Sequence, residues 1–149
     1  MRHLALYAAA ATIAAGPALA LDAAVQRVME RRIQPAIETL STQSGALRTT
    51  VDALCAAPSA AALDAARAGF VSALGAFAAA SVYDFGPARA DDRFARLLFW
   101  PDRGGRGLRN VQGLIAKPDP ALDAAALRGK RVDIQGFPAL EFALYGTGA

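Results

Sequence analysis

The chain has 149 residues, of which 54% are hydrophobic, and its 16 basic and 13 acidic side chains give a formal net charge of +3. This length suits one domain that buries about two-thirds of its unfolded surface. The positive excess is small and spread along the chain, which argues against nucleic acid as a partner.

The first twenty residues have the pattern of a secretory signal peptide. A charged start, Met1–His3, precedes an apolar run over residues 4–13, and Ala18-Leu19-Ala20 follows. The run is about half the roughly 20 apolar residues that a spanning helix needs, and the small-x-small pattern is typical of a signal-peptidase site. The sequence therefore predicts residues 1–20 as a signal peptide and residues 21–149 as one exported domain of the periplasm or cell envelope, with no membrane span. The alternative for residues 1–20 is an N-terminal helix that belongs to the core.

Histidine and cysteine usage restricts the chemistry of the mature domain. The only histidine, His3, leaves with the signal peptide, which excludes histidine zinc sites, Ser-His-Asp triads and Cys-His dyads within the chain. The only cysteine, Cys55, excludes an intramolecular disulfide. Because Leu54, Ala56 and Ala57 flank Cys55, we expect it to be a buried small hydrophobe, with a reactive or cross-linking thiol as the alternative.

A long amphipathic helix is expected over Asp22–Ala56. Its apolar side chains recur mostly every three or four residues and form one stripe, made of Val25, Val28, Met29, Ile33, Ile37, Leu40, Leu47, Val51 and Leu54. Pro35 lies inside this pattern and cannot donate the helical hydrogen bond. We therefore expect either a kink or a helix that restarts with Pro35 in its first turn.

A second helix is expected after Pro58-Ser59, with Ser59 as its N-cap. One face carries Leu63, Ala66, Phe70, Leu74, Phe77 and Ser81 at helical spacing. Gly69 and Gly75 lie within this alanine-rich helix, so a neighbouring helix is expected to approach it closely. Residues 83–90 are expected to form a loop with two aromatic anchors.

Shorter helices are expected in the rest of the chain, over Arg93–Phe99, Leu108–Ala116, Asp119–Leu127 and Pro138–Tyr145. Asp91 or Asp92 would cap the first of them, and Asp119 the third. Helical periodicity recurs along the chain and no convincing strand pair is present. The sequence therefore predicts an all-α fold, an up-and-down helical bundle.

The segment Phe99-Trp100-Pro101-Asp102 is the first candidate site. Either its aromatic residues plug a helix end while Asp102 fixes the following turn, or Trp100 and Asp102 line a cleft. The next segment, Arg103–Gly107, precedes a helix, and its backbone amides and arginines suit an anion. It lacks the Gly-Lys-Ser/Thr ending of a P-loop, so nucleotide binding is not supported. A plain flexible loop is the alternative.

Glu141 is the next candidate. It lies in the first turn of the last expected helix, where the helix dipole favours a carboxylate. It also lies four residues from both Phe137 and Tyr145 on a heavily apolar helix. A carboxylate in such surroundings is costly unless it is paired. We therefore expect an arginine or a functional ligand close by, with a purely structural role as the alternative.

Three stretches together resemble the imelysin (insulin-cleaving peptidase) family of bacterial envelope proteins. They are residues 54–58 (LCAAP), 99–102 (FWPD) and 135–146 (QGFPALEFALYG), in fitting order and spacing. The resemblance covers residues 22–147 but only the N-terminal half of the family pattern. It implies an all-helical protein with two bundle-like halves and a site between them. It also implies export, a frequent association with iron acquisition and, in some members, metallopeptidase activity.

The signature of this family is Gly-x-His-x-x-Glu, in which histidine and glutamate lie on one helix face and can share a metal ion. Gly136 and Glu141 match it, whereas Pro138 replaces the histidine and has no donor atom for a metal. The resemblance therefore implies only Gly136 and Glu141 as ligand-binding residues. Trp100 and Asp102 are added as wall residues from the cleft interpretation of their own segment. Glu141 is the one candidate ligand for a divalent metal, and no catalytic residue is assigned.

These observations favour a non-enzymatic binding or interaction module linked to iron or metal acquisition. A metallopeptidase-like half-site completed by a partner chain and a truncated, inactive remnant are the alternatives. The last helix is apolar on nearly all sides, through Phe137, Leu140, Phe142, Leu144 and Tyr145. Such a helix belongs in an interior, so we expect self-association or a second helical half that is encoded separately.

Overall fold

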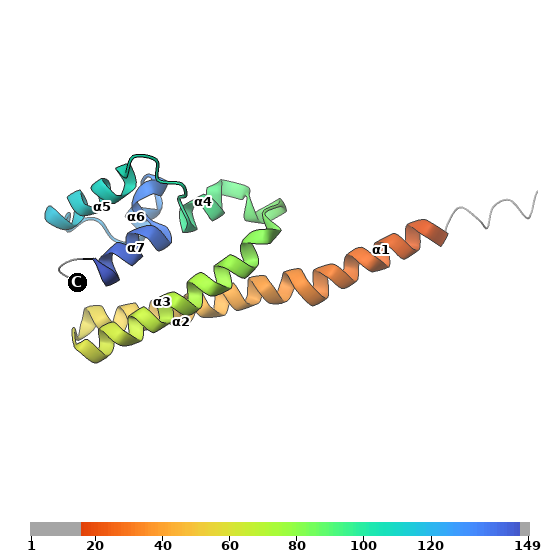
Figure 1. Ribbon diagram of the computed structural model, residues 1–149, viewed down its shortest axis with the longest axis horizontal. Helices are drawn as coiled ribbons and strands as arrows, with labels where there is room; N and C mark the ends of the chain where they lie inside the picture. Colours follow the sequence, from red (N-terminus) through yellow and green to blue (C-terminus); the bar gives the residue numbers. More distant parts are fainter. Residues whose placement is uncertain (1–15, 147–149) are drawn as a thin grey trace, which may run out of the picture. The chain divides into compact units, whose positions relative to one another are not determined.

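The computed structural model describes the backbone of residues 16–146 and the side chains of residues 22–146. Within this range the chain forms helices and turns with no β-strand, which confirms the predicted all-α helical fold (Figure 1). It divides into a first unit that ends at Glu38 and a second unit that begins at Thr39. Most of the predicted signal peptide, residues 1–15, lies outside the described residues.

The first unit contains α1 (Gly16–Val28), a π-helical turn (Met29–Ile33) and the start of α2 (Gln34–Ala56). The Gln34 N–H donates to the carbonyl of Met29, five residues earlier. Pro35 has no N–H to donate to the carbonyl four residues before it, and the wider π turn lies where that bond is missing. Pro35 is therefore the second residue of α2 and lies in its first turn, as one of the two alternatives predicted, but the helical backbone continues through the π turn and does not restart.

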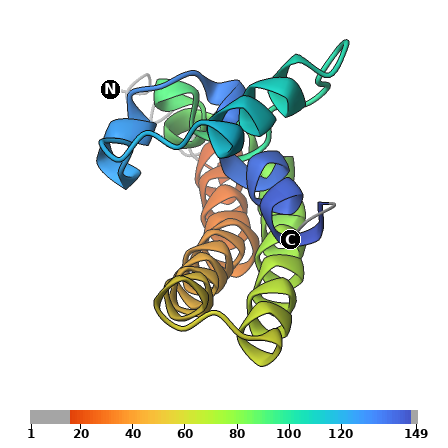
Figure 2. The same cartoon turned by 90° about the vertical axis from the view of Figure 1, so that its left-hand side faces the viewer.

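In the second unit, α2 and α3 (Ala60–Ala80) run antiparallel (Figure 2). Ser59 caps α3 by accepting a hydrogen bond from the Ala62 N–H at 3.1 Å, as predicted. The two helices approach closely at Gly69, where an added Cβ would lie 2.9 Å from Thr50 Oγ1. At Gly75 no described atom lies within 4 Å of an added Cβ. The predicted close approach is thus right for Gly69 and wrong for Gly75.

Cys55 is exposed, so the prediction that it is buried is wrong. Val51 and Leu54 on the apolar stripe of α2 are half-buried. Cys55 follows Leu54 and is therefore turned about 100° away from it around the helix. Its alanine neighbours, which suggested an apolar environment, are exposed as well.

The segment Ala60–Tyr83, which is α3 and the 3₁₀ turn after it, is long and apolar enough to span a membrane by length and composition alone. The expectation that no such stretch follows the signal peptide is therefore wrong. A core helix has the same composition, and α3 buries Ala66, Phe70, Ala73 and Phe77. In the structure α3 is the helix on which the aromatic core of the second unit is built.

The rest of the second unit consists of short helices and 3₁₀ turns. The helices are α4 (Arg93–Leu97), α5 (Arg106–Ala116), α6 (Ala124–Arg128) and α7 (Gly136–Tyr145), and the turns are Ser81–Tyr83, Gly86–Ala88, Ala90–Asp92 and Val132–Ile134. α7 packs against both α3 and α5. The predicted short helices are therefore present, although their ends differ.

The predicted caps of α4 and α6 are wrong. Asp91 and Asp92 both have a left-handed backbone with φ of 55°, and Asp92 makes no side-chain bond that caps α4. Asp91 instead pairs with Arg93 at 3.4 Å. α6 is capped by Asp123, which accepts a first-turn amide at 2.7 Å, and not by Asp119. Capping depends on the backbone direction before the helix, which residue type and spacing do not specify.

The core of the second unit is an aromatic cluster between α3, α4 and α7. The ring of Phe70 lies 5.8 Å from the rings of both Phe137 and Tyr145. The ring of Phe77 lies 5.4 Å from those of Phe94 and Phe137. Three of these pairs are edge-on and the Phe77–Phe137 pair is tilted, and aromatic pairs at such separations stabilise a core beyond the apolar area that they bury. Phe137 joins the two halves of the cluster and so fixes α7 on α3.

The last turn of α7 is also bonded to α3 through Arg67 and Tyr145. The Arg67 Nε–H donates to the carbonyl of Leu144 at 2.8 Å, and the Tyr145 hydroxyl donates to the carbonyl of Arg67 at 3.2 Å. The guanidinium of Arg67 lies 5.1 Å from the centre of the Tyr145 ring, a cation–π distance. These contacts satisfy a carbonyl at the end of α7 that has no helical partner.

Candidate functional site

A cavity of about 380 Å³ lies between α5, α7 and the segment before α5. Its apolar walls include four aromatic residues, Phe99, Trp100, Phe142 and Tyr145. Its acidic lining residues are Asp102, Asp133 and Glu141. The structure thus brings together three of the predicted site residues, Trp100, Asp102 and Glu141, around one cavity. It adds Asp133, which the sequence analysis missed.

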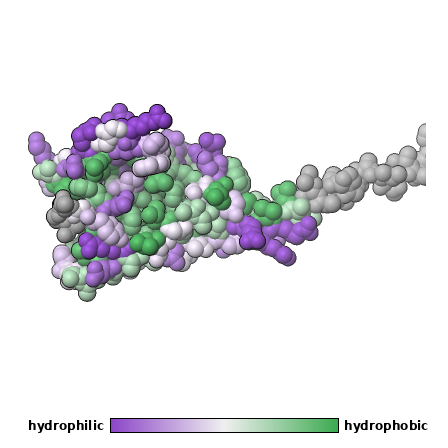
Figure 3. Space-filling view, in the orientation of Figure 1, coloured by the Kyte–Doolittle hydropathy of each residue, from purple (hydrophilic) through white to green (hydrophobic). Residues whose placement is uncertain are grey.

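The surface of the second unit is divided into hydrophobic and hydrophilic areas. In the space-filling view, hydrophobic residues gather in the middle of the face of the second unit that is shown (Figure 3). Hydrophilic residues follow the edge where α5 and the loop before it lie. Trp100 is 77% exposed, so it does not plug a helix end, which was one of its two predicted roles.

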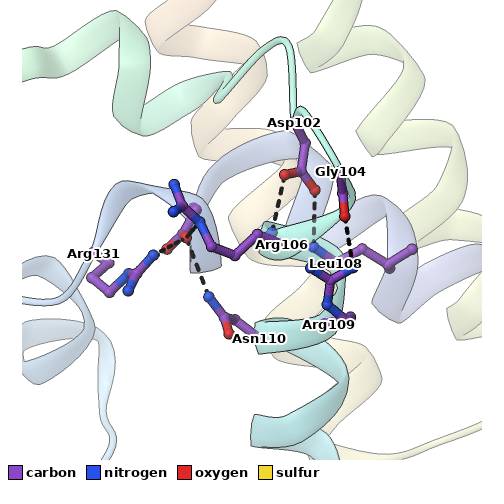
Figure 4. Close-up of polar contacts among 9 residues, drawn as sticks. Asp102, Gly104, Arg106, Leu108, Arg109, Asn110 and Arg131 are labelled. Carbon is purple, nitrogen blue, oxygen red and sulfur yellow. Dashed lines mark hydrogen bonds and ion pairs between the residues drawn. The ribbon is translucent and has the colours of Figure 1, made fainter.

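Asp102 caps α5 across the intervening loop. Its carboxylate accepts hydrogen bonds from the Gly107 N–H at 3.1 Å and the Leu108 N–H at 3.2 Å (Figure 4). The Gly107 bond, with further amide bonds from Leu108 and Arg106, holds the pKa of Asp102 below its ordinary value. The anion predicted at this helix start is therefore the protein's own carboxylate. The predicted loop ends earlier than expected, because Arg106 and Gly107 belong to α5.

Asp133 is held beside the cavity by side chains from two elements. Its side chain is 3% exposed, and Arg131 donates to both of its oxygens, with a distance of 3.0 Å from Nε. Asn110 donates to it at 3.2 Å, and Arg106 forms an ion pair at 3.8 Å (Figure 4). The hydrogen bond from Arg131 holds the pKa of Asp133 below its ordinary value, against the opposing effect of burial.

Close packing at Gly107 brings the two acidic positions together. An added Cβ there would lie 2.8 Å from the Asp133 carbonyl oxygen and 3.2 Å from Asp102 Oδ2. Only a residue without a side chain fits at this point without displacing backbone. The glycine at position 107 is therefore explained by the contact between α5 and the Val132–Ile134 turn.

These two carboxylates predict a loss of stability in acid. Folding lowers the pKa of Asp102 and Asp133, so the stabilisation that they give is fully present above the pKa of an unfolded aspartate, about 4. It is lost as the pH falls through their lower pKa values in the folded state. We expect the free energy of unfolding, measured with urea between about pH 7 and pH 3, to decrease below about pH 4.

Asp133→Asn cannot ionise, so this variant should show a shallower decrease than the wild type over the same pH range. Asp52→Asn removes an exposed carboxylate that pairs with Arg48 on α2, and it should keep the wild-type slope. Equal slopes for the wild type and Asp133→Asn would contradict the role of Asp133.

Glu141 differs from the other two carboxylates because it is exposed and unpaired. No hydrogen bond or ion pair to Glu141 is found among residues 22–146. The expectation of a nearby arginine is therefore wrong. The physical reason is that Glu141 lies at the open cavity, where water reaches its charge and burial does not require a partner.

Gly136 lies away from this cavity and has a structural role. It has a left-handed φ of +76°, and an added Cβ would overlap the carbonyl oxygens of Arg96 and Leu97. Gly136 also lines a second, mostly apolar cavity of about 440 Å³ on another side of α7, together with Leu97 and Leu140. The glycine of the Gly-x-Pro-x-x-Glu segment therefore sets where α7 begins and, through it, where Glu141 lies.

The donors around the cavity do not fit a bound metal ion. Pro138 and Glu141 are three residues apart on α7 and both line the cavity, but only Glu141 has a donor atom in its side chain. Asp102 is bonded to amides and Asp133 to Arg131, as described above. Among residues 22–146, no group of three histidine, cysteine, aspartate or glutamate side chains is placed to hold a metal ion. Protein metal sites for zinc usually need three or four such ligands.

Comparison with known proteins identifies a family. A family model described as imelysin matches residues 33–149, which is most of the chain. No curated protein and no solved structure shows significant similarity to the chain.

Proposed function

Because the chain belongs to the imelysin family, we propose that it acts as a binding domain of the cell envelope and not as a peptidase. Its ligand site is the cavity between α5 and α7. The observation that carries the proposal is the state of the three acidic residues around that cavity. Asp102 and Asp133 are bonded within the protein, and Glu141 is left without a partner among residues 22–146.

The chemistry of the lining residues supports binding over hydrolysis. Peptide-bond cleavage needs a nucleophile, a general base beside it, or a metal that activates water. Among the described residues, no serine, threonine, cysteine, histidine or lysine lines the cavity. Glu141 by itself supplies a charge and a hydrogen-bond acceptor, which are the properties of a ligand-binding group.

Export and a role in iron or metal acquisition belong to the same proposal. The signal-peptide pattern of residues 1–20 supports export to the periplasm or cell envelope. The resemblance to imelysin proteins supports the link to iron or metal. Growth of the native host under iron limitation, compared with and without the gene, would test this link. Unchanged growth in the deletion strain would contradict that link.

A peptidase assay tests the proposed function. The full chain is expressed in a bacterial host, the protein is isolated from the periplasm, and its intact mass is expected to correspond to a chain that begins at Leu21. The purified protein is then incubated with zinc and an unstructured peptide substrate. We expect no cleavage above the buffer control, because Asp102 and Asp133 are bonded within the protein and the described lining of the cavity has no serine, threonine, cysteine or histidine for Glu141 to activate. Zinc-dependent cleavage that Glu141→Gln abolishes would contradict the proposal.

A further inference from the structure

We infer that the cavity between α5 and α7 binds an organic ammonium ion, with the Glu141 carboxylate as its counter-charge and aromatic rings as its walls. The inference rests on the proposed binding function and adds the chemical class of the ligand. A small amine and the side chain of a lysine both present this chemistry.

The charge around the cavity favours a cation. Of residues 22–146, no lysine or arginine lines it, whereas three carboxylates do. The charge of Asp102 is offset by the amides at the start of α5, and that of Asp133 by Arg131 and Arg106. Glu141 forms no ion pair with any described side chain, so its carboxylate is available to a ligand.

The walls favour an organic cation over an inorganic one. Phe99, Trp100, Phe142 and Tyr145 all line the cavity, and aromatic faces attract ammonium groups through the ring quadrupole. Tyr145 already has the Arg67 guanidinium at 5.1 Å from its ring centre, which leaves the other three rings for a ligand. A metal ion, by contrast, needs several oxygen, nitrogen or sulfur donors, which these walls do not supply.

Size and access agree with this ligand class. The volume of about 380 Å³ lies within the range of about 300–1,000 Å³ that is typical of small-molecule sites. Glu141 and Trp100 are both exposed, so a ligand reaches them from solvent. An exposed tryptophan and a carboxylate without a described ion-pair partner thus line the same cavity, and both attract an organic ammonium group.

Tryptophan fluorescence gives a direct test, because Trp100 is the only tryptophan of the chain. Choline chloride is titrated into the mature protein at constant ionic strength, beside 3,3-dimethyl-1-butanol, the neutral carbon isostere of choline. We expect a saturable change in Trp100 emission with choline and at least about tenfold weaker binding of the alcohol. Equal binding of both, or no saturable change with choline, would overturn the inference.

A pair of variants distinguishes the effect of the Glu141 charge on binding from an effect on folding. Glu141→Gln should weaken choline binding about five- to tenfold and leave binding of the neutral alcohol unchanged. Because Glu141 is exposed and makes no described bond, this variant should fold like the wild type. Asp52→Asn removes an exposed charge that does not line the cavity and should not alter choline binding. Wild-type choline affinity in Glu141→Gln would overturn the inference.

The same assay distinguishes the two sources of the ammonium group. Free butylamine and a short peptide with one lysine are compared as probes. Tighter binding of the peptide indicates a protein side chain, and tighter binding of butylamine indicates a free amine. Failure of both while choline binds would overturn these two sources and restrict the ligand class to quaternary ammonium ions. These outcomes are independent of the peptidase assay, which alone decides whether the domain is a binding protein or an enzyme.

Discussion

Replacing Gly136 with alanine should lower the free energy of unfolding of the second unit by about 3 kcal/mol or more. The backbone at Gly136 has φ of +76°, which a residue with a Cβ adopts only at a cost. The added Cβ would also lie 2.8 Å from the Leu97 carbonyl carbon and overlap the carbonyl oxygens of Arg96 and Leu97. Neither backbone segment can move away without shifting α4 or α7. Urea unfolding of both proteins measures the difference.

Gly75→Ala is the matched control, because Gly75 lies inside α3 with no described atom within 4 Å of an added Cβ. There alanine should stabilise the protein by about 0.5–1 kcal/mol through its higher helix propensity. A loss of less than about 1 kcal/mol in Gly136→Ala would show that this position tolerates a side chain. In that case the glycine would not determine the beginning of α7.

Phe137→Ala should lower the free energy of unfolding by about 3–5 kcal/mol, the usual range for a buried phenylalanine. Phe137 is 6% exposed and its ring lies 5.8 Å from that of Phe70 and 5.4 Å from that of Phe77. Alanine would leave a void between α3 and α7 and remove contacts to both rings. Thermal and urea unfolding of the purified variant measure the effect.

Phe85→Ala provides the comparison, since Phe85 is 51% exposed. It should cost less than about 1 kcal/mol, because little apolar area returns to water. If Phe137→Ala and Phe85→Ala lost similar stability, the aromatic cluster would not be the core that fixes α7 on α3.

Local patterns predicted most of the helices because they follow from the chain itself. Helical spacing placed Phe70 and Phe77 on one face of a helix, and both are buried. The missing N–H of Pro35 predicted an irregularity in the first long helix, which is the π turn before α2. Ser59 was predicted as a cap from its residue type and position. The prediction from sequence neighbours was wrong at Cys55, which is exposed. Its burial is determined by its angular position around the helix and not by the apolar residues beside it in the sequence.

The polar structure beside the cavity could not be predicted in the same way. Burial of Asp133 depends on Arg131 beside it and on Asn110 and Arg106 from α5. Its position between two apolar residues, Val132 and Ile134, was the one feature of the sequence that could have indicated a buried carboxylate. Asp102 reaches the α5 amides across a turn with two left-handed glycines, Gly104 and Gly105. Such contacts join residues that are brought together only when the chain folds. No regular spacing in the sequence therefore predicts them.

Self-association of the domain, or its pairing with a second helical half, stays a prediction. Of the last-helix residues that led to this prediction, Phe137 and Leu144 are buried within the chain, whereas Tyr145 remains 46% exposed. Exposed apolar surface is where a partner would bind. Sedimentation of the mature protein at micromolar concentration decides it, and a compact monomer that does not associate would contradict it.

The central claim is that the cavity is a ligand site that lacks the donor atoms of a metal centre. Zinc affinity tests this claim most directly. Calorimetric titration of zinc into the mature wild-type protein should show binding weaker than about micromolar, which corresponds to roughly −8 kcal/mol. Pro138→His places a second donor three residues before Glu141 on α7, so it should tighten binding by about tenfold. Stoichiometric zinc binding by the wild type, tighter than about micromolar, would contradict the account.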